Sequence, residues 1–106
     1  MKFAPHILAE VRLLPTEAGG RKGPTPPDVF DCQIGSGGEY FEIRIDLSGI
    51  GSLSPGSTAS VPIRFSRPEH LLMWIVVGTE FSISEVGEVG KIGGGKVLEI
   101  YESPAA

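Results

Sequence analysis

The stretch GTEFSISEVGEVGKIGGGKVLEIY, residues 78–101, decides the fold. Phe81 and Ile83 alternate with polar residues, which is the period-two pattern of a half-buried strand. A second apolar run, 97–101, follows a connection that contains Gly87, Gly90, Gly93, Gly94 and Gly95. Because glycine permits tight turns and bulges, we expect a final hairpin that closes an antiparallel sheet on itself.

Four upstream segments also alternate between apolar and polar residues, and they predict strands at 7–14, 29–34, 40–47 and 58–65. In the first strand, Ala9, Val11 and Leu13 are expected on the core side. The third strand has the clearest alternation, which predicts one buried and one solvent-exposed face. Pro62 falls on the outer side of the fourth strand, which indicates an edge or a bulge. A second copy of the chain could pair there as a homodimer.

Two segments do not follow this pattern. Residues 15–28 contain four prolines and three glycines, so they cannot form regular structure. Such a long loop is either functional or a proline-stiffened crossover between two strands of a barrel. Residues 71–77, LLMWIVV, show no alternation and are expected in the core; a binding patch formed by Met73 and Trp74 is the alternative.

Short strands separated by Gly/Pro turns, with no helix longer than about one turn, predict an all-β fold. The chain has 106 residues, which is enough for one domain with one core. We expect a flexible lead-in at 1–6, a single small antiparallel closed β-barrel at 7–101, and a tail at 102–106.

Composition restricts the environment and the partners. The formal net charge of −4 disfavours strong non-specific binding to nucleic acid or to an anionic membrane. Cys32 is the single cysteine, which excludes an internal disulfide and indicates a buried apolar role. The N-terminus lacks the layout of a signal peptide, and the longest apolar run is too short to span a bilayer. We therefore expect a soluble cytoplasmic protein with no membrane partner.

Motifs that carry catalytic chemistry are absent from the sequence. The segment 93–96, GGGK, lacks the spacing and the Ser/Thr of a phosphate-binding loop, so bulge glycines are the better interpretation. His6 and His70 are far apart and only one cysteine exists, which argues against a structural zinc site. We expect no cofactor, no metal and no enzymatic activity, with a small enzyme built from loops as a minor alternative.

Three segments in order resemble the C-terminal β-barrel domain, domain III, of elongation factor Tu and its translational GTPase relatives. That family has an acidic residue and then G-G-R after its first strand, and this chain has EAGGR at 17–21. The family has a P-G turn entering an alternating strand, and here Pro55-Gly56 precedes VPIRF at 61–65. The family closes with R-F-x-I-x-E-G-G, V-G-x-G and an apolar strand, which resemble 80–87, 92–95 and 97–100.

The resemblance covers roughly residues 6–101 and implies a six-stranded, Greek-key-like antiparallel barrel. In the family this domain contacts the T-stem of aminoacyl-tRNA, the GTPase domain and the nucleotide exchange factor. The resemblance implies a stand-alone binding module that contacts a protein partner through the 19–27 loop and the 85–91 connection. The alternative is an RNA- or tRNA-binding, translation-related protein that uses Arg21, Lys22 and Lys91. The candidate partner-binding residues are Gly19, Gly20, Arg21, Lys22, Glu85, Gly87 and Lys91.

Overall fold

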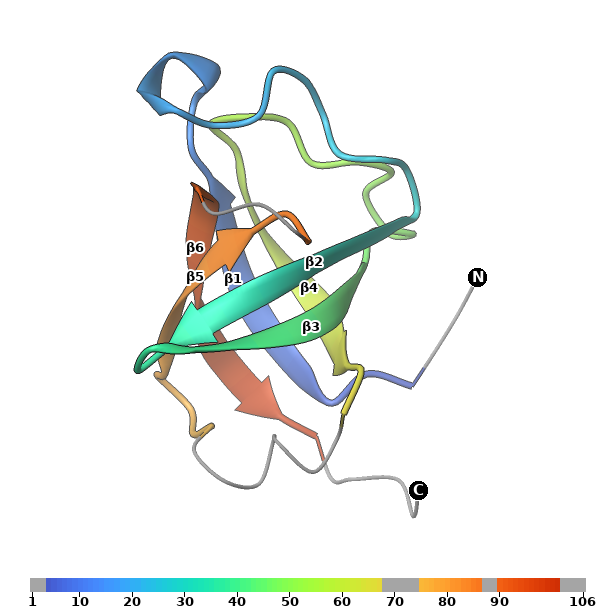
Figure 1. Ribbon diagram of the computed structural model, residues 1–106. Coiled ribbons are helices and arrows are strands. Elements are labelled where there is room, and N and C mark those ends of the chain that lie inside the picture. Colours follow the sequence, from blue (N-terminus) through green and yellow to red (C-terminus); the bar gives the residue numbers. More distant parts are fainter. Residues whose placement is uncertain (1–3, 68–74, 87–89, 102–106) are drawn as a thin grey trace.

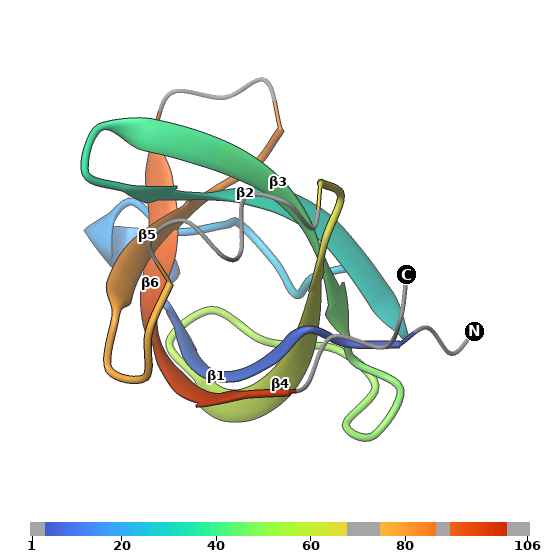
Figure 2. The same cartoon turned by 90° about the horizontal axis from the view of Figure 1, so that it is seen from below.

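A computed structural model describes residues 4–67, 75–86 and 90–101. Within these residues six strands form a closed antiparallel barrel in the spatial order β1-β4-β3-β2-β5-β6 (Figures 1 and 2). The predicted fold class, a small six-stranded antiparallel closed β-barrel, is confirmed. The strands are β1 (Ile7–Leu13), β2 (Val29–Ser36), β3 (Glu39–Asp46), β4 (Thr58–Phe65), β5 (Glu80–Ser84) and β6 (Lys91–Ile100).

The strand order explains the proline-rich segment 15–28. β1 lies beside β4 and β6, whereas β2, the next strand in sequence, lies beside β3 and β5. The chain must therefore cross one end of the barrel between β1 and β2, as in a Greek key. Figure 1 shows this connection above the barrel, beginning with the short 3-10 turn η1 (Thr16–Ala18). The interpretation of this segment as a crossover is confirmed.

The crossover is packed against the connection between β3 and β4. The Thr25 N–H donates to the Leu53 carbonyl at 2.9 Å, and the Leu53 N–H donates to Thr25 Oγ1 at 2.9 Å. The Asp28 N–H donates to the Gly51 carbonyl at 2.8 Å. Thr25 and Leu53 are both buried, so these two connections together cover one end of the barrel.

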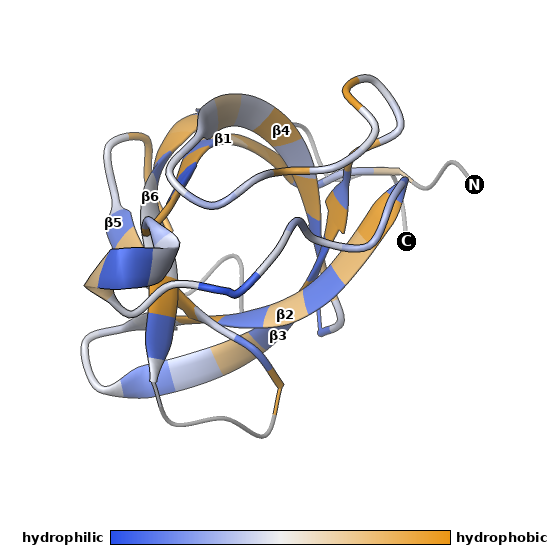
Figure 3. Ribbon diagram, turned by 90° about the horizontal axis from the view of Figure 1, so that it is seen from above, coloured by the Kyte–Doolittle hydropathy of each residue, from blue (hydrophilic) through white to orange (hydrophobic). Residues whose placement is uncertain are grey.

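Alternating apolar side chains fill the barrel, as the sequence pattern predicts. Ala9, Val11 and Leu13 are all buried, and the first four strands lie within two residues of their predicted ends. The alternation of polar and apolar residues along β2 and β3 is visible in Figure 3. One continuous core is formed by residues of β2, β3 and β4, namely Phe30, Cys32, Ile34, Phe41, Ile43, Ile45, Val61, Ile63 and Phe65, and by Phe81, Ile83, Ile92 and Val97 of β5 and β6.

The glycines of the closing hairpin have a different role from the predicted one. Gly93, Gly94 and Gly95 lie inside β6 rather than in the connection before it, and the register shifts occur beside them, at Ile92 and Leu98. Gly95 pairs with Phe81, and a Cβ on Gly95 would lie 2.6 Å from Phe81 Cζ. Glycine is needed at position 95 because the Phe81 ring covers the backbone there, and at position 93 because a Cβ would overlap the Arg12 carbonyl oxygen of β1.

Two further expectations need correction. In the segment 71–77, Ile75 is buried as predicted, but Val76 and Val77 are more than 60% exposed. They belong to a turn in which the Thr79 N–H donates to the Val76 carbonyl at 3.0 Å. Residues 71–74, including Met73 and Trp74, lie outside the described residues.

β4 is not an edge strand, because it pairs with β1 on one side and with β3 on the other. The predicted irregularity at Pro62 is local: the pairing of β4 with β3 ends at Ile63, and Pro62 continues to pair with Leu8 of β1. A proline is tolerated at such a position because one side of the strand requires no ladder hydrogen bond there.

Candidate binding site

The two segments that the sequence nominates for partner binding meet at one end of the barrel. They form an open hollow of about 470 Å³, lined by 19–23 from the crossover and by Glu85 and 90–92 from the region between β5 and β6. These segments lie more than 60 residues apart in sequence. The barrel brings them together because the crossover passes over the ends of β5 and β6.

Gly19 and Gly20 shape the turn that leads into the hollow. η1 ends at Gly19, which has a φ of +95° and whose N–H donates to the Thr16 carbonyl at 3.2 Å. The Gly20 N–H donates to the Pro15 carbonyl at 3.0 Å. A Cβ on Gly20 would overlap the carbonyl oxygen of Leu14. Both positions therefore require glycine for backbone reasons.

Arg21 holds the crossover in place. Its Nη1 forms an ion pair with Glu85 Oε1, and its Nε and Nη2 donate to the carbonyls of Gly23 and Pro24, each at 3.2 Å. Its guanidinium carbon also lies 5.3 Å from the centroid of the Phe30 ring, a cation–π distance. The Arg21 side chain is 18% exposed. The guanidinium thus links the crossover, β2 and the end of β5.

Lys22 and Lys91 differ from Arg21. Both line the hollow and both are exposed, and neither forms an ion pair with another described residue. Their ammonium groups therefore remain accessible to a ligand. Of the seven predicted residues, Gly19, Gly20, Arg21, Lys22, Glu85 and Lys91 are brought together here, whereas Gly87 lies outside the described residues.

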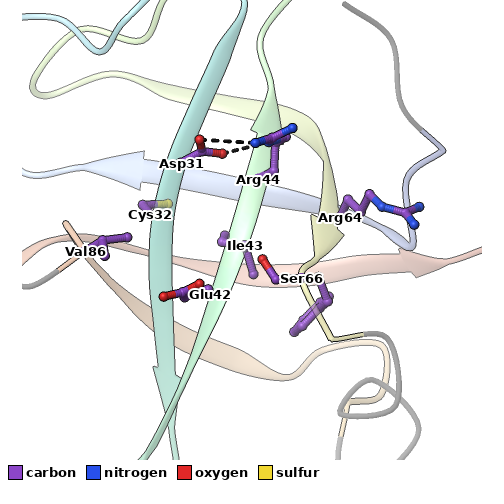
Figure 4. Close-up of a pocket in the computed structure, with 9 residues that line it drawn as sticks. Asp31, Cys32, Glu42, Ile43, Arg44, Arg64, Ser66 and Val86 are labelled. Atoms are coloured by element: carbon purple, nitrogen blue, oxygen red, sulfur yellow. Dashed lines mark hydrogen bonds and ion pairs between the residues drawn. The ribbon is translucent and has the colours of Figure 1, made fainter.

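A second hollow, of about 430 Å³, lies on the outer wall of β2, β3 and β4 (Figure 4). Its charges are mostly engaged with one another or with the backbone. Arg44 Nε forms an ion pair with Asp31 Oδ1 at 2.8 Å, and Arg64 Nη1 donates to the Ala4 carbonyl at 2.7 Å. Figure 4 shows Arg64 directed away from the Asp31–Arg44 pair, so the arginines do not converge on one ligand position.

Cys32 is buried beneath this wall, as predicted. Burial, together with the negative charges of Asp31 and Glu85, raises the pKa of the Cys32 thiol. The side chain is therefore a neutral packing group rather than a nucleophilic thiolate. Across the described ranges, no three His, Cys, Asp or Glu side chains are grouped to hold a metal ion.

His6 is a buried polar group with a structural role that the sequence does not reveal. It is buried, and its Nδ1 accepts a hydrogen bond from the Phe65 N–H at 3.0 Å. Sequence reasoning also missed the contact of Phe30 with Arg21, because the alternation marks Phe30 only as a core residue. The sequence offers only a weak signal of such a contact: Arg21 follows two glycines in a loop, and the next strand contains Phe30.

No helix in the part of the chain that the structure describes has the length and apolarity needed to cross a membrane. No protein-family model matches the chain, and a search of curated proteins finds no match. The resemblance to domain III of elongation factor Tu therefore stays a prediction.

Proposed function

We propose that this protein is a non-enzymatic binding module that contacts a protein partner through the hollow between the crossover and the β5–β6 region. The observation that supports this most directly is the convergence of two irregular segments around a concave surface that carries two exposed lysines, Lys22 and Lys91. Loops held on a rigid scaffold are common sites of recognition. The resemblance to domain III of elongation factor Tu points to the same two segments and to a translation-related role in the cytoplasm.

The geometry divides the candidate residues into two groups. Gly19, Gly20, Arg21 and Glu85 shape and hold the hollow through their own internal contacts. Lys22 and Lys91 are the cations with no internal ion pair among the described lining residues. Direct contact with a partner is therefore assigned chiefly to the two lysines, and the other four residues position them.

A protein partner is favoured over RNA. Binding to single-stranded nucleic acid uses a continuous basic groove with aromatic side chains on which bases stack. Here the Arg21 charge is paired with Glu85, Phe30 is buried under Arg21, and the whole chain carries a net charge of −4. The two exposed lysines provide too little positive charge for strong phosphate binding.

The test is a pull-down from lysate in which both proteins and RNA are recovered. The protein is compared with a Lys22→Gln/Lys91→Gln variant and with an Arg12→Gln/Lys96→Gln control. Arg12 and Lys96 are also exposed, lie on β1 and β6, and lose the same total charge when substituted. A protein that is retained by the wild type and the control but lost by the lysine variant supports the proposal. Equal capture by all three, or capture of RNA alone, contradicts it.

A further inference from the structure

We infer that the hollow binds the carboxylates of an acidic segment of a partner protein. This inference rests on the proposed function, because it names the chemistry of the partner at the same hollow. The occupant follows from the sign of the local charge, from the hydrogen bonds that Arg21 already makes, and from the open space above the glycines.

The charge of the hollow is opposite to that of the whole protein. Its described lining contains three cations, Arg21, Lys22 and Lys91, and one carboxylate, Glu85. The chain as a whole has a net charge of −4. A concave surface of the opposite sign steers and orients a complementary partner. Glu88 lies outside the described residues.

The hydrogen bonds of Arg21 leave one part of its guanidinium open to exchange. Nε and Nη2 are held by backbone carbonyls of the crossover, whereas Nη1 is held by the Glu85 carboxylate. Glu85 is 39% exposed, so water and solutes reach the ion pair. A carboxylate from a partner can share Nη1 with Glu85 while the guanidinium stays in its place, and charge-assisted contacts of this kind are stronger than neutral ones.

The backbone of the hollow allows close approach. A Cβ added at Gly19, Gly23 or Gly90 would meet no atom within 4 Å, so open space lies over each of these residues. The N–H groups of Lys22 and Gly23 have no acceptor among the described residues. A partner carboxylate can therefore accept backbone N–H bonds as well as contact the lysine ammonium groups.

The experiment is an NMR titration of the backbone amides with three probes. The first is a short capped peptide of alternating Glu and Gly, the second is the same peptide with Gln for Glu, and the third is a short single-stranded oligouridine. We expect the Glu peptide to shift the amides of Gly19, Gly23 and Gly90 and the Gln peptide to leave them unchanged. In the Lys22→Gln/Lys91→Gln variant the affinity should fall by about tenfold or more, because two charge-assisted contacts are lost.

The Arg12→Gln/Lys96→Gln variant should bind the Glu peptide as the wild type does. Equal shifts with the Gln peptide, shifts spread evenly over the strands, or tighter binding of oligouridine would overturn the inference. If the Glu peptide fails to bind while capture of a lysate protein still depends on Lys22 and Lys91, the proposed function stands and the acidic partner is wrong. If both fail, both proposals are wrong.

Discussion

At each end of the barrel, chain outside the strands is held against the strands, and the two ends do this with different chemistry. At the crossover end, Arg21 holds irregular chain against the barrel with a charged, partly exposed side chain that pairs with Glu85. At the opposite end, the buried His6 links three strands. Its backbone N–H donates to the Ile63 carbonyl at 2.8 Å, and its backbone carbonyl accepts the Tyr101 N–H at 2.9 Å. Its side chain makes the third bond, in which Nδ1 accepts the Phe65 N–H at 3.0 Å.

The difference separates stability from binding. A buried neutral histidine costs less to desolvate than a buried charge, and its hydrogen bond to the Phe65 N–H offsets that cost; removal of the ring leaves a buried donor with no acceptor. A partly exposed ion pair such as Arg21–Glu85 contributes modest net stability, and its open side can exchange partners with a ligand. The His6 end is therefore suited to holding the barrel closed, whereas the Arg21 end is the one where we propose that a partner binds.

The largest effect is expected from His6→Ala. This substitution leaves the Phe65 N–H without its acceptor and removes a buried ring whose centroid lies 6.3 Å from that of Phe65. The free energy of unfolding should fall by about 2–4 kcal/mol, measured by chemical denaturation.

His6→Asn is the matched control for this prediction. Its Oδ1 can take the place of Nδ1 as the acceptor, so Asn should restore part of the stability that Ala loses. If Ala and Asn destabilise the barrel equally, the hydrogen bond to Phe65 does not stabilise this end of the barrel.

A smaller effect is expected at the other end from Gly20→Ala. The new Cβ would overlap the Leu14 carbonyl oxygen, so the turn that delivers Arg21 has to move. We expect a loss of about 1–3 kcal/mol and weaker binding of any partner at the hollow. Gly23→Ala is the control, because its Cβ would meet no atom within 4 Å and should change stability by less than about 0.5 kcal/mol. Similar losses in the two variants would contradict this steric explanation.

The strands could be predicted from sequence because their signal is local. Alternation along β1, β3 and β4 reports which side chains face the core, and the structure buries Val11, Ile43 and Ile63 accordingly. The role of the glycines in β6 could not be predicted. The choice between a turn glycine and a glycine covered by Phe81 depends on which strand lies beside β6, and that pairing is set by the closed barrel.

The candidate site was only half predictable for the same reason. The irregularity of 15–28 and of the β5–β6 connection marks both segments, and the family resemblance selects Arg21 and Glu85. That these two residues pair with each other rather than with a partner depends on contacts across the barrel. His6 carried no signal at all, because a single histidine before a strand is equally compatible with an exposed or a buried position.

Lowering the pH should reduce the stability that His6 contributes to the barrel. Burial, and then the positive charge of Arg64, hold the pKa of His6 below its ordinary value of 6.5. As the pH falls, the unfolded chain therefore takes up a proton before the folded one does. The contribution of His6 to the free energy of unfolding is complete above pH 6.5 and declines as the pH falls toward the folded-state pKa. The loss is at most about 1.4 kcal/mol per pH unit.

The pH effect is measured by denaturation of the wild type and of His6→Asn between about pH 8 and pH 5, the range in which histidine titrates. The wild type should lose stability relative to His6→Asn as the pH falls. Parallel curves for the two proteins would show that His6 does not titrate differently in the folded state.

The smallest effect on stability is expected from Glu85→Gln and from salt. The side chains of Arg21 and Glu85 are 18% and 39% exposed, and their ion pair should contribute about 1 kcal/mol or less to the free energy of unfolding. Added salt should reduce this contribution through screening while leaving the neutral His6 contacts unchanged. Denaturation at low and high salt should therefore show that the stability difference between wild type and Glu85→Gln depends on salt. The stability difference between wild type and His6→Asn should stay the same at both salt concentrations at neutral pH. A large salt-independent loss in Glu85→Gln would mean that the Arg21 end holds the barrel closed as the His6 end does, and the separation of stability from binding would not hold.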